Sequence, residues 1–176
     1  MTGQRELILG GARSGKSRLA EQRALASQKQ CVYIATAAAL DDEMAQRIVR
    51  HQASRGAQWR TVEEQTSLAG CLRREADEGR CIVVDCLTLW LSNCLHAQCW
   101  ESERSALLEL LPALPGRVIL VSNETGLGVV PMGELSRQFV DEAGFLHQDL
   151  AAVCDEVTLT VAGLPLSLKP GSGSAP

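Results

Sequence analysis

The stretch Gly10-Gly-Ala-Arg-Ser-Gly-Lys-Ser17 decides the fold of this chain of 176 residues. It follows the apolar run Leu7-Ile8-Leu9, which is typical of a strand, and precedes residues 18–25, which favour a helix. Glycines at this spacing let backbone N–H groups turn inward around a polyphosphate, while the lysine adds a cation and the serine a hydroxyl for Mg²⁺. A glycine-rich turn without a ligand is the alternative. The strand and helix around it favour a phosphate-binding loop that holds a nucleoside triphosphate through Gly10, Gly11, Ala12, Arg13, Ser14, Gly15, Lys16 and Ser17.

The composition is that of an ordinary globular protein. Hydrophobic residues make up 45% of the chain, charged residues make up 22%, and the formal net charge is -4. A weakly acidic chain has no general attraction for nucleic acid or acidic membranes, so small molecules are the expected partners. No apolar run reaches the roughly 18 residues of a membrane-spanning helix, and no secretory pattern precedes the first strand. Seven cysteines without a Cys-x-x-Cys pair favour reduced thiols and a cytoplasmic location.

Short apolar segments alternate with helical patterns along the chain. Strands are expected at Glu6–Gly10, Cys31–Thr36, Cys81–Cys86, Arg117–Ser122 and Glu156–Val161. Helices are expected at Lys16–Ser27, Asp42–Arg55, Ser67–Asp77, Leu87–Cys99, Glu101–Leu111 and Gly133–Cys154, the last interrupted by glycines. Near-continuous apolar strands are typical of parallel sheets that helices cover on both faces. The sequence therefore predicts a single α/β domain at residues 1–169, with a doubly wound, mainly parallel sheet of the P-loop NTPase type, and a flexible tail at residues 170–176.

Polar residues follow several of these strands, at the edge where open α/β sheets bind their ligands. Asp85 comes after the apolar run Ile82-Val83-Val84, so it is a candidate to hold Mg²⁺, directly or through water, opposite Ser17. A carboxylate that caps the following helix is its alternative role. The other polar strand ends are Ala35-Thr36-Ala37 and Ser122-Asn123-Glu124-Thr125-Gly126.

His51 lies near the end of the helix expected at residues 42–55. Met44, Ile48 and His51 share one helical face, and arginines at 47, 50 and 55 surround the histidine. A histidine at a helix C-terminus is more often a dipole partner or a packing residue than a nucleophile. Spacing alone therefore favours a structural role for His51.

Six segments together carry a family resemblance: Gly10–Ser17, Tyr33-Ile-Ala-Thr36, Asp41-Asp-Glu-Met44, Arg47-Ile48 with His51, Trp59-Arg-Thr-Val-Glu63 and Asn123-Glu-Thr-Gly-Leu-Gly-Val-Val-Pro131. In this order, over nearly the whole chain, they resemble the bifunctional adenosylcobinamide kinase/adenosylcobinamide-phosphate guanylyltransferase of cobalamin biosynthesis. The loop alone would be generic, whereas the later segments are specific to that family. The chain shows no departure at the matched functional positions.

The resemblance implies two reactions on one corrinoid. A nucleoside triphosphate phosphorylates adenosylcobinamide, and GMP from GTP then passes to that phosphate through a guanylylated histidine, which releases pyrophosphate and gives adenosylcobinamide-GDP. The matching histidine is His51. Lys16 of the loop, which offsets charge on the phosphates, is the second expected catalytic residue. ATP and GTP are the implied substrates, and Mg²⁺ is expected at Ser17 and Asp85, as the loop motif and the strand end indicate. The resemblance adds to the nucleotide site Ala35, Thr36, Ala37, Gln52, Ala53, Ser54, Arg55, Glu63 and Asp85.

Several roles stay open at this stage. Glu63 could contact the guanine edge or the ribose, or act as a solvated acid. Trp59 and Arg60 could stack at the site or be plain core and surface residues. His96 and His147 match no motif and are expected to be surface or packing residues. The family suggests a homo-oligomer, a trimer. A P-loop kinase of another small metabolite, or a nucleotide-binding protein without transferase activity, would share the loop and Asp85 but would not use His51 as a nucleophile.

Overall fold

The computed structural model describes residues 3–37 and 58–171. Seven strands and five α-helices make up this part of the chain, together with one 3₁₀ turn at Leu111–Ala113. The strands are β1 (Gln4–Gly10), β2 (Gln30–Ala35), β3 (Trp59–Glu63), β4 (Arg80–Asp85), β5 (Arg117–Asn123), β6 (Glu156–Val161) and β7 (Leu164–Lys169). The helices are α1 (Lys16–Ala26), α3 (Leu68–Glu75), α4 (Leu87–His96), α5 (Trp100–Leu110) and α6 (Glu134–Val153).

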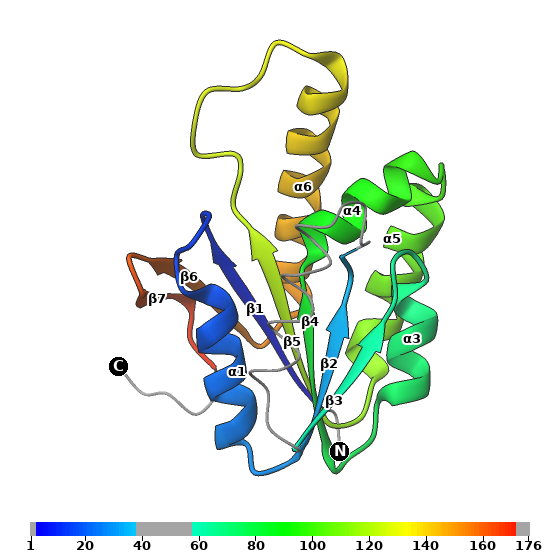
Figure 1. Cartoon of the computed structure of the whole chain (residues 1–176), viewed down its shortest axis with the longest axis vertical. Helices are drawn as coiled ribbons and strands as arrows, with labels where there is room; N and C mark the ends of the chain where they lie inside the picture. The colour runs from blue at the N-terminus through cyan, green and yellow to red at the C-terminus, as the bar shows by residue number, and fades with distance from the viewer. Residues whose placement is uncertain (1–2, 38–57, 172–176) are drawn as a thin grey trace.

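The strands form one sheet in the order β3-β2-β4-β5-β1-β6-β7 (Figure 1). All neighbours are parallel except β6 and β7, which form an antiparallel pair. This confirms the predicted mainly parallel sheet and all five predicted strands. The chain passes from β1 to β2 across two intervening strands, so β5 lies between the strand that leads into the phosphate-binding loop and the strand that ends at Asp85.

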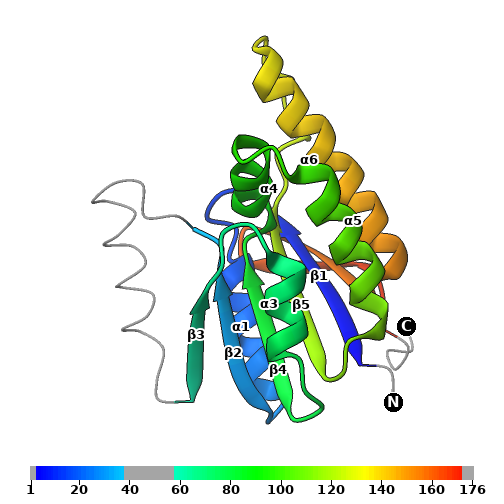
Figure 2. The ribbon, with the colours of Figure 1, turned by 90° about the vertical axis from the view of Figure 1, so that its right-hand side faces the viewer.

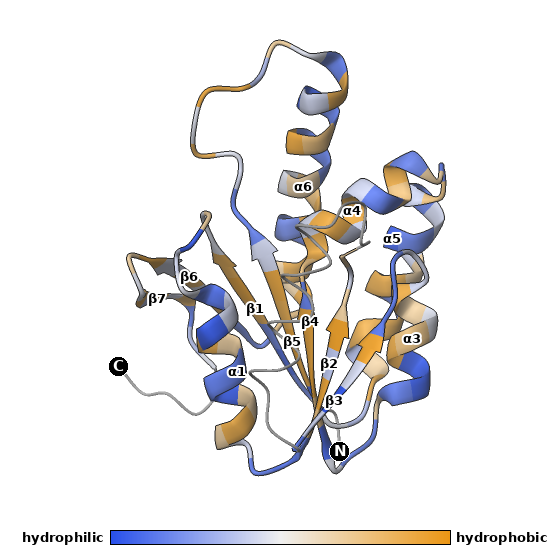
Figure 3. Ribbon diagram, viewed as in Figure 1, coloured by the Kyte–Doolittle hydropathy of each residue, from blue (hydrophilic) through white to orange (hydrophobic). Residues whose placement is uncertain are grey.

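Helices cover both faces of the sheet, as the apolar strands predict. Helix α1 lies on one face, where Ala20 and Ala24 pack against Ile8 and Val83. Helices α3, α4, α5 and α6 lie on the other face (Figure 2). Figure 3 shows the central strands as the most hydrophobic part of the ribbon.

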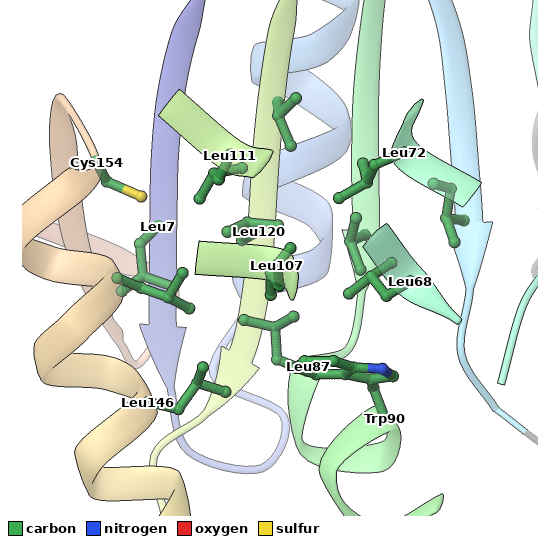
Figure 4. Close-up of a cluster of buried hydrophobic side chains, with 14 of the residues drawn as sticks. Leu7, Leu68, Leu72, Leu87, Trp90, Leu107, Leu111, Leu120, Leu146 and Cys154 are labelled. Atoms are coloured by element: carbon green, nitrogen blue, oxygen red, sulfur yellow. The ribbon is translucent and has the colours of Figure 1, made fainter. Parts of the chain in front are cut away.

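The larger core lies between the sheet and the four-helix layer. Figure 4 shows side chains of α3, α4, α5 and α6 lying over the sheet, with Trp90 next to Leu87 and with Leu107 of α5 beside Leu120. The ring of Trp90 packs edge-on against Trp100, with 5.2 Å between ring centroids. The apolar stretch at residues 87–100 is thus buried against its own sheet, since Leu87, Trp90 and Leu91 have no exposed surface.

Two strands, β3 and β7, were not predicted from the sequence. Strand β3 lies at the edge of the sheet and is half-exposed, so its sequence lacks the continuous apolar run of a buried strand. Strand β7 is exposed along its whole length. It follows the two-residue turn Ala162-Gly163, in which both residues have positive φ, and alanine at such a position gives no turn signal.

Within the described residues, the five other predicted helices form with small shifts at their ends. Helix α6 runs unbroken through Gly144, since one glycine costs a helix only about 1 kcal/mol and the burial of Ala143, Leu146 and Leu150 offsets it. The helix predicted at residues 42–55 lies outside the described residues, as do residues 172–176 of the predicted tail. No helix in the described ranges is both long and apolar enough to cross a membrane.

All seven cysteines are free thiols, and all but Cys99 are buried. Burial disfavours the thiolate, which raises the pKa of Cys81 to about 11 and that of Cys154 to about 12. A thiol with so high a pKa is a poor nucleophile and a poor target for oxidation. Burial of the thiols agrees with the expectation of reduced cysteines, which stays a prediction.

The carboxylate of Glu6 ties α1 to the sheet. Its side chain is completely buried on β1, and it accepts hydrogen bonds from Arg23 of α1 and, at 2.7 Å, from Arg117 of β5. Arg23 also reaches Glu156 of β6 at 2.7 Å. Glu6 and its two arginines thus join α1 to β1, β5 and β6.

We expect Glu6→Ala to lower the free energy of unfolding by about 3–5 kcal/mol, because it leaves two partly buried arginines without their central acceptor. Urea denaturation of the variant measures the loss. The matched control is Asp149→Ala, which removes the half-exposed partner of Arg104 and should cost about 1 kcal/mol or less. Equal losses in the two variants would contradict the role of Glu6.

Candidate active site

The phosphate-binding loop turns sharply between β1 and α1. Arg13 and Gly15 both have positive φ, at 54° and 93°, and α1 begins at Lys16. A Cβ on Gly10 would lie 2.4 Å from Oγ of Ser14, so only glycine fits where the chain leaves β1. The Nζ of Lys16 donates to the carbonyl oxygen of Gly11 at 2.9 Å across the loop.

Two observations show that this loop suits a polyphosphate. The Oγ of Ser14 is buried inside the loop and has no hydrogen-bond partner among the described residues. A Cβ added to Gly11 would meet nothing within 4 Å, so the space beside that residue is open. Since buried hydroxyl groups are nearly always satisfied, the orphaned Ser14 hydroxyl marks a place for an external acceptor or donor.

The turn between β6 and β7 supports the loop from the side, which the sequence did not predict. The N–H of Gly163 donates to the carbonyl oxygen of Ser14 at 2.9 Å. A Cβ on Gly15 would lie only 3.3 Å from Cα of Gly163, so the two backbones approach closely. The exposed hairpin therefore helps to hold the loop in shape.

Asp85 ends β4 on the face of the sheet that α1 covers. Its register partners are Ala35 on β2 and Val121 on β5, while Gly10 is level with Asn123. Strands are about 4.8 Å apart, and Gly10 lies two residues, about 6.6 Å, beyond the level of Asp85, so about 12 Å separate Asp85 from the start of the loop. A hydrated Mg²⁺ and a phosphate group fill a gap of this size, whereas a direct side-chain contact would not.

The hydroxyl of Tyr33 donates to Oδ2 of Asp85 at 2.8 Å. Tyr33 is almost fully buried on β2, and its ring packs edge-on against Trp59 with 6.2 Å between centroids. Helix α4 has no side-chain cap, so Asp85 does not serve as the helix cap that was its alternative role. Tyr33 instead fixes one carboxylate oxygen of Asp85.

A second set of hydrogen bonds joins the ends of β2 and β4. The hydroxyl of Thr36 donates to the carbonyl oxygen of Cys86 at 2.7 Å and accepts from the N–H of Cys86 at 2.8 Å. Asn93 of α4 donates to the carbonyl oxygen of Thr36 at 2.8 Å. The buried Thr36 side chain thus fixes the neighbouring strand ends, with Ala35 before it and the half-exposed Ala37 after it.

Glu63 ends β3 level with Ala35, which is level with Asp85. The structure thus places Glu63, Ala35 and Asp85 in one row along the edge of the sheet. Trp59 and Arg60 are consecutive residues of a strand, so they point to opposite faces and do not stack on each other. Trp59 packs on Tyr33, and Arg60 pairs with Glu75 at 3.0 Å. His51 and the predicted nucleotide-binding residues Gln52, Ala53, Ser54 and Arg55 lie outside the described residues.

A buried histidine at the end of β5 was not among the predicted site residues. His147 of α6 lies with Nε2 at 2.8 Å from Oγ of Ser122 and Nδ1 at 3.7 Å from Oε2 of Glu124. The N–H of Glu124 donates to the carbonyl oxygen of Gly10 at 2.9 Å. His147 is thus a packing residue, as expected, but it packs against the segment that touches the phosphate-binding loop. The only sequence feature that pointed to this contact was Ser122 at the predicted end of a strand.

The residues present suit Mg²⁺ better than a metal held by protein alone. The described ranges contain no group of three or more His, Cys, Asp or Glu side chains that could hold a metal ion. Mg²⁺ usually keeps several waters and binds one or two protein oxygens together with substrate phosphates. Ser17 in the first turn of α1 and Asp85 on the same face of the sheet fit that mode of binding.

Fold and loop together define the class: this is an α/β protein of the P-loop NTPase type. Two solved structures share the arrangement. The flagellar accessory protein FlaH from Methanocaldococcus jannaschii matches with a TM-score of 0.54 and 12% identity, over 97% of this chain and 80% of that one. The RadB recombinase matches with a TM-score of 0.50 and 19% identity, over 90% and 74%. At these identities the likeness concerns the fold alone.

Sequence comparison gives the particular family. Residues 6–168 match the family described as cobinamide kinase / cobinamide phosphate guanyltransferase. The bifunctional adenosylcobalamin biosynthesis protein CobP of Pseudomonas aeruginosa is 64% identical over 168 residues, which are 94% of this chain and 97% of that protein. The bifunctional adenosylcobalamin biosynthesis protein CobU of Escherichia coli is 37% identical over 93% of this chain and 98% of its own length. The chain belongs to this family of bifunctional transferases, which confirms the resemblance found in the sequence.

We expect Tyr33→Phe to weaken the binding of Mg²⁺ with nucleotide, because it removes the donor that orients Asp85 while it keeps the ring. Titration with a fluorescent GTP analogue should give the wild-type Kd in EDTA. In Mg²⁺ the Kd should rise about fivefold, since a hydrogen bond to a carboxylate contributes ~1 kcal/mol or more. The control Asp85→Asn keeps an acceptor for Tyr33 but loses the charge, and it should abolish the effect of Mg²⁺. Unchanged Mg²⁺ dependence in Tyr33→Phe would contradict the role of Tyr33.

His147 should make the stability depend on pH. Burial lowers the pKa of His147 below its ordinary value of about 6.5, and the nearby Glu124 carboxylate only partly opposes this. The neutral ring is favoured in the folded state, so its stabilising contribution is complete above pH 6.5 and is lost as the pH falls through the lowered folded-state pKa.

The measurement is the free energy of unfolding from pH 8 to pH 5. Wild type should lose more stability toward pH 5 than His147→Gln, which has no titrating group at this position. His96→Gln, a substitution at an exposed histidine, is the control variant. Parallel curves for wild type and His147→Gln would contradict the prediction.

Proposed function

We propose that this chain carries out two reactions at the carboxyl edge of its sheet: phosphoryl transfer to adenosylcobinamide, and guanylyl transfer to adenosylcobinamide phosphate. In the second reaction, guanylylated His51 is the covalent intermediate. Family membership supports the two activities. The structural observation that supports the location of the site is the arrangement of its residues along this edge. There the phosphate-binding loop after β1, Asp85 of β4, Ala35 of β2 and Glu63 of β3 lie along one edge of the sheet, with β5 between β1 and β4.

In the first transfer, the hydroxyl oxygen of adenosylcobinamide attacks the γ-phosphorus of ATP or GTP. The bond between the γ-phosphorus and the bridging oxygen breaks, the nucleoside diphosphate leaves, and the hydroxyl proton is released. Lys16 and the N–H groups from Gly10 to Ser17 hold the phosphates and offset their charge. Ser17 and Asp85 would hold Mg²⁺, which would neutralise the charge of the triphosphate and of its leaving group.

In the second transfer, a ring nitrogen of His51 attacks the α-phosphorus of GTP and pyrophosphate leaves. An oxygen of adenosylcobinamide phosphate then attacks the same phosphorus, the P–N bond breaks, and the histidine is regenerated. Neutral imidazole is a competent nucleophile near pH 7. The nucleotide residues proposed beside His51 are Gln52, Ala53, Ser54, Arg55 and Glu63, since Glu63 ends a strand in the same row as Asp85.

We further propose that the functional unit is a cytoplasmic homo-oligomer, a trimer by family resemblance, with the domain at residues 1–169 and a flexible tail at residues 170–176. The outer strand β7 supports association between copies. Leu164, Leu166 and Leu168 are all exposed on it, and an apolar edge strand of this kind needs a cover.

The proposed intermediate is tested with GTP labelled at the α-phosphorus. Wild type with Mg²⁺ should become labelled, and the label should be lost in acid and survive alkali, as expected for phosphorus bonded to a histidine nitrogen. His51→Ala should take up no label while it still binds GTP through the loop. His96→Ala removes an exposed histidine and should be labelled like wild type. If the folded wild type binds GTP but takes up no label, the covalent mechanism is refuted and a simple kinase is favoured.

A further inference from the structure

A cavity of about 390 Å³ lies between α4, the N-terminal half of α6 and the segment that joins β5 to α6. In Figure 1 this segment rises beyond the ends of the strands and returns into the part of α6 that projects past the sheet. The cavity therefore opens at the carboxyl end of the sheet. Its lining residues Leu95 and Phe139 pack against the larger core, so it is on the face opposite α1.

Two connections join this cavity to the edge that carries the phosphate-binding loop. Thr125 lines the cavity and directly follows Glu124, whose N–H donates to the carbonyl oxygen of Gly10. On the other wall, Ser92 lines the cavity next to Asn93, which donates to the carbonyl oxygen of Thr36. A ligand in the cavity thus lies beside the ends of β1, β2 and β5, where phosphoryl groups would be held.

The lining of the cavity suits a neutral ligand that is largely apolar. None of the ten residues that line it is Asp, Glu, Lys or Arg, so a second nucleotide would find no cation for its phosphates. Leu95, Leu135 and Phe139 supply an apolar wall, while hydroxyl groups and one imidazole supply polar contacts. Nδ1 of His96 lies 2.9 Å from the carbonyl oxygen of Ser92, so in the neutral ring Nδ1 is the donor and Nε2 presents a lone pair.

Exposed apolar side chains continue the cavity outward. Val129 is 97% exposed, Met132 94% and Leu127 81%, all in the segment between β5 and α6. A macrocycle wider than the cavity can insert one edge and lay its remaining surface on these side chains. Such a patch of exposed large hydrophobic residues marks a binding surface.

We propose that this cavity is the acceptor subsite: it takes one edge of the corrin ring, whose methyl groups meet the leucines and Phe139 and whose amide side chains meet Ser92, His96 and Ser136. The inference rests on the proposed function, because it assigns a place to that function's corrinoid substrate. The amide N–H groups donate to Nε2 of His96 and to hydroxyl oxygens, and the amide carbonyls accept from the hydroxyls. The substrate hydroxyl then reaches the phosphate edge past Thr125.

The test places a larger side chain on α6 so that it occupies the cavity. Ser136 is an exposed cavity residue, and Ser136→Trp should raise the Kd for adenosylcobinamide about tenfold or more, which corresponds to about 1.4 kcal/mol. A second variant, Leu135→Asp, places a charge on the same wall and should also weaken binding. Gln148→Trp on the exposed side of the same helix is the matched control and should bind like wild type. Absorbance titration of the corrinoid measures binding without turnover, and GTP binding should be unchanged in all three variants.

Each outcome decides the inference. Wild-type affinity for the corrinoid in both Ser136→Trp and Leu135→Asp would overturn the subsite and leave the proposed function standing. A change of oligomeric state in these variants, seen by size-exclusion chromatography, would assign the cavity to a contact between copies and would also overturn it. Failure of wild type itself to bind or phosphorylate the corrinoid would instead refute the proposed function.

Discussion

The buried carboxylate of Glu6 determines where α1 lies over the sheet, and the phosphate-binding loop depends on that placement. The loop is the short connection from β1 to α1, so any rotation of α1 would move its N–H groups and Lys16. Glu6 prevents this through Arg23, which it bonds at the far end of the helix, and through Arg117, which holds the same acid to β5. At the near end, Gly163 bonds the loop directly. The helix is thus fixed at both ends before any ligand binds, which lowers the cost of ordering the loop on binding.

The parallel sheet then gathers the remaining chemistry at one edge. Because β1 to β6 all run in the same direction, every polar residue that ends a strand comes to the same side of the molecule. The hydrogen bonds at that edge mostly join one strand end to its neighbour: Tyr33 to Asp85, Thr36 to Cys86 and Glu124 to Gly10. These bonds hold the edge in a fixed geometry without using the loop N–H groups that would face a phosphate.

The sequence predicted those parts of the fold that have a strong local signal. Buried strands such as Cys31–Thr36 show it as continuous apolar runs, and the loop shows it as glycine spacing. Strand β3 has no such signal because an edge strand is half-exposed, and β7 has none because all six of its residues are exposed. At the site, Asp85 could be predicted from its position after a strand, whereas Tyr33 and His147 could not. Their roles come from contacts across 52 and 25 residues of sequence, which only the folded sheet brings together.

The two faces of the sheet give the proposed reaction its geometry. Asp85 and Tyr33 lie on the face that α1 covers, and the cavity lies on the opposite face between α4 and α6. The end of β5 separates them, with Asn123 level with Gly10. Phosphoryl transfer needs the attacking oxygen and the leaving oxygen on opposite sides of phosphorus. A nucleotide held from the side of α1 and an acceptor held from the side of α4 and α6 approach one phosphorus from opposite directions. The sheet edge between them would therefore enforce in-line attack, without a side chain dedicated to orienting the acceptor.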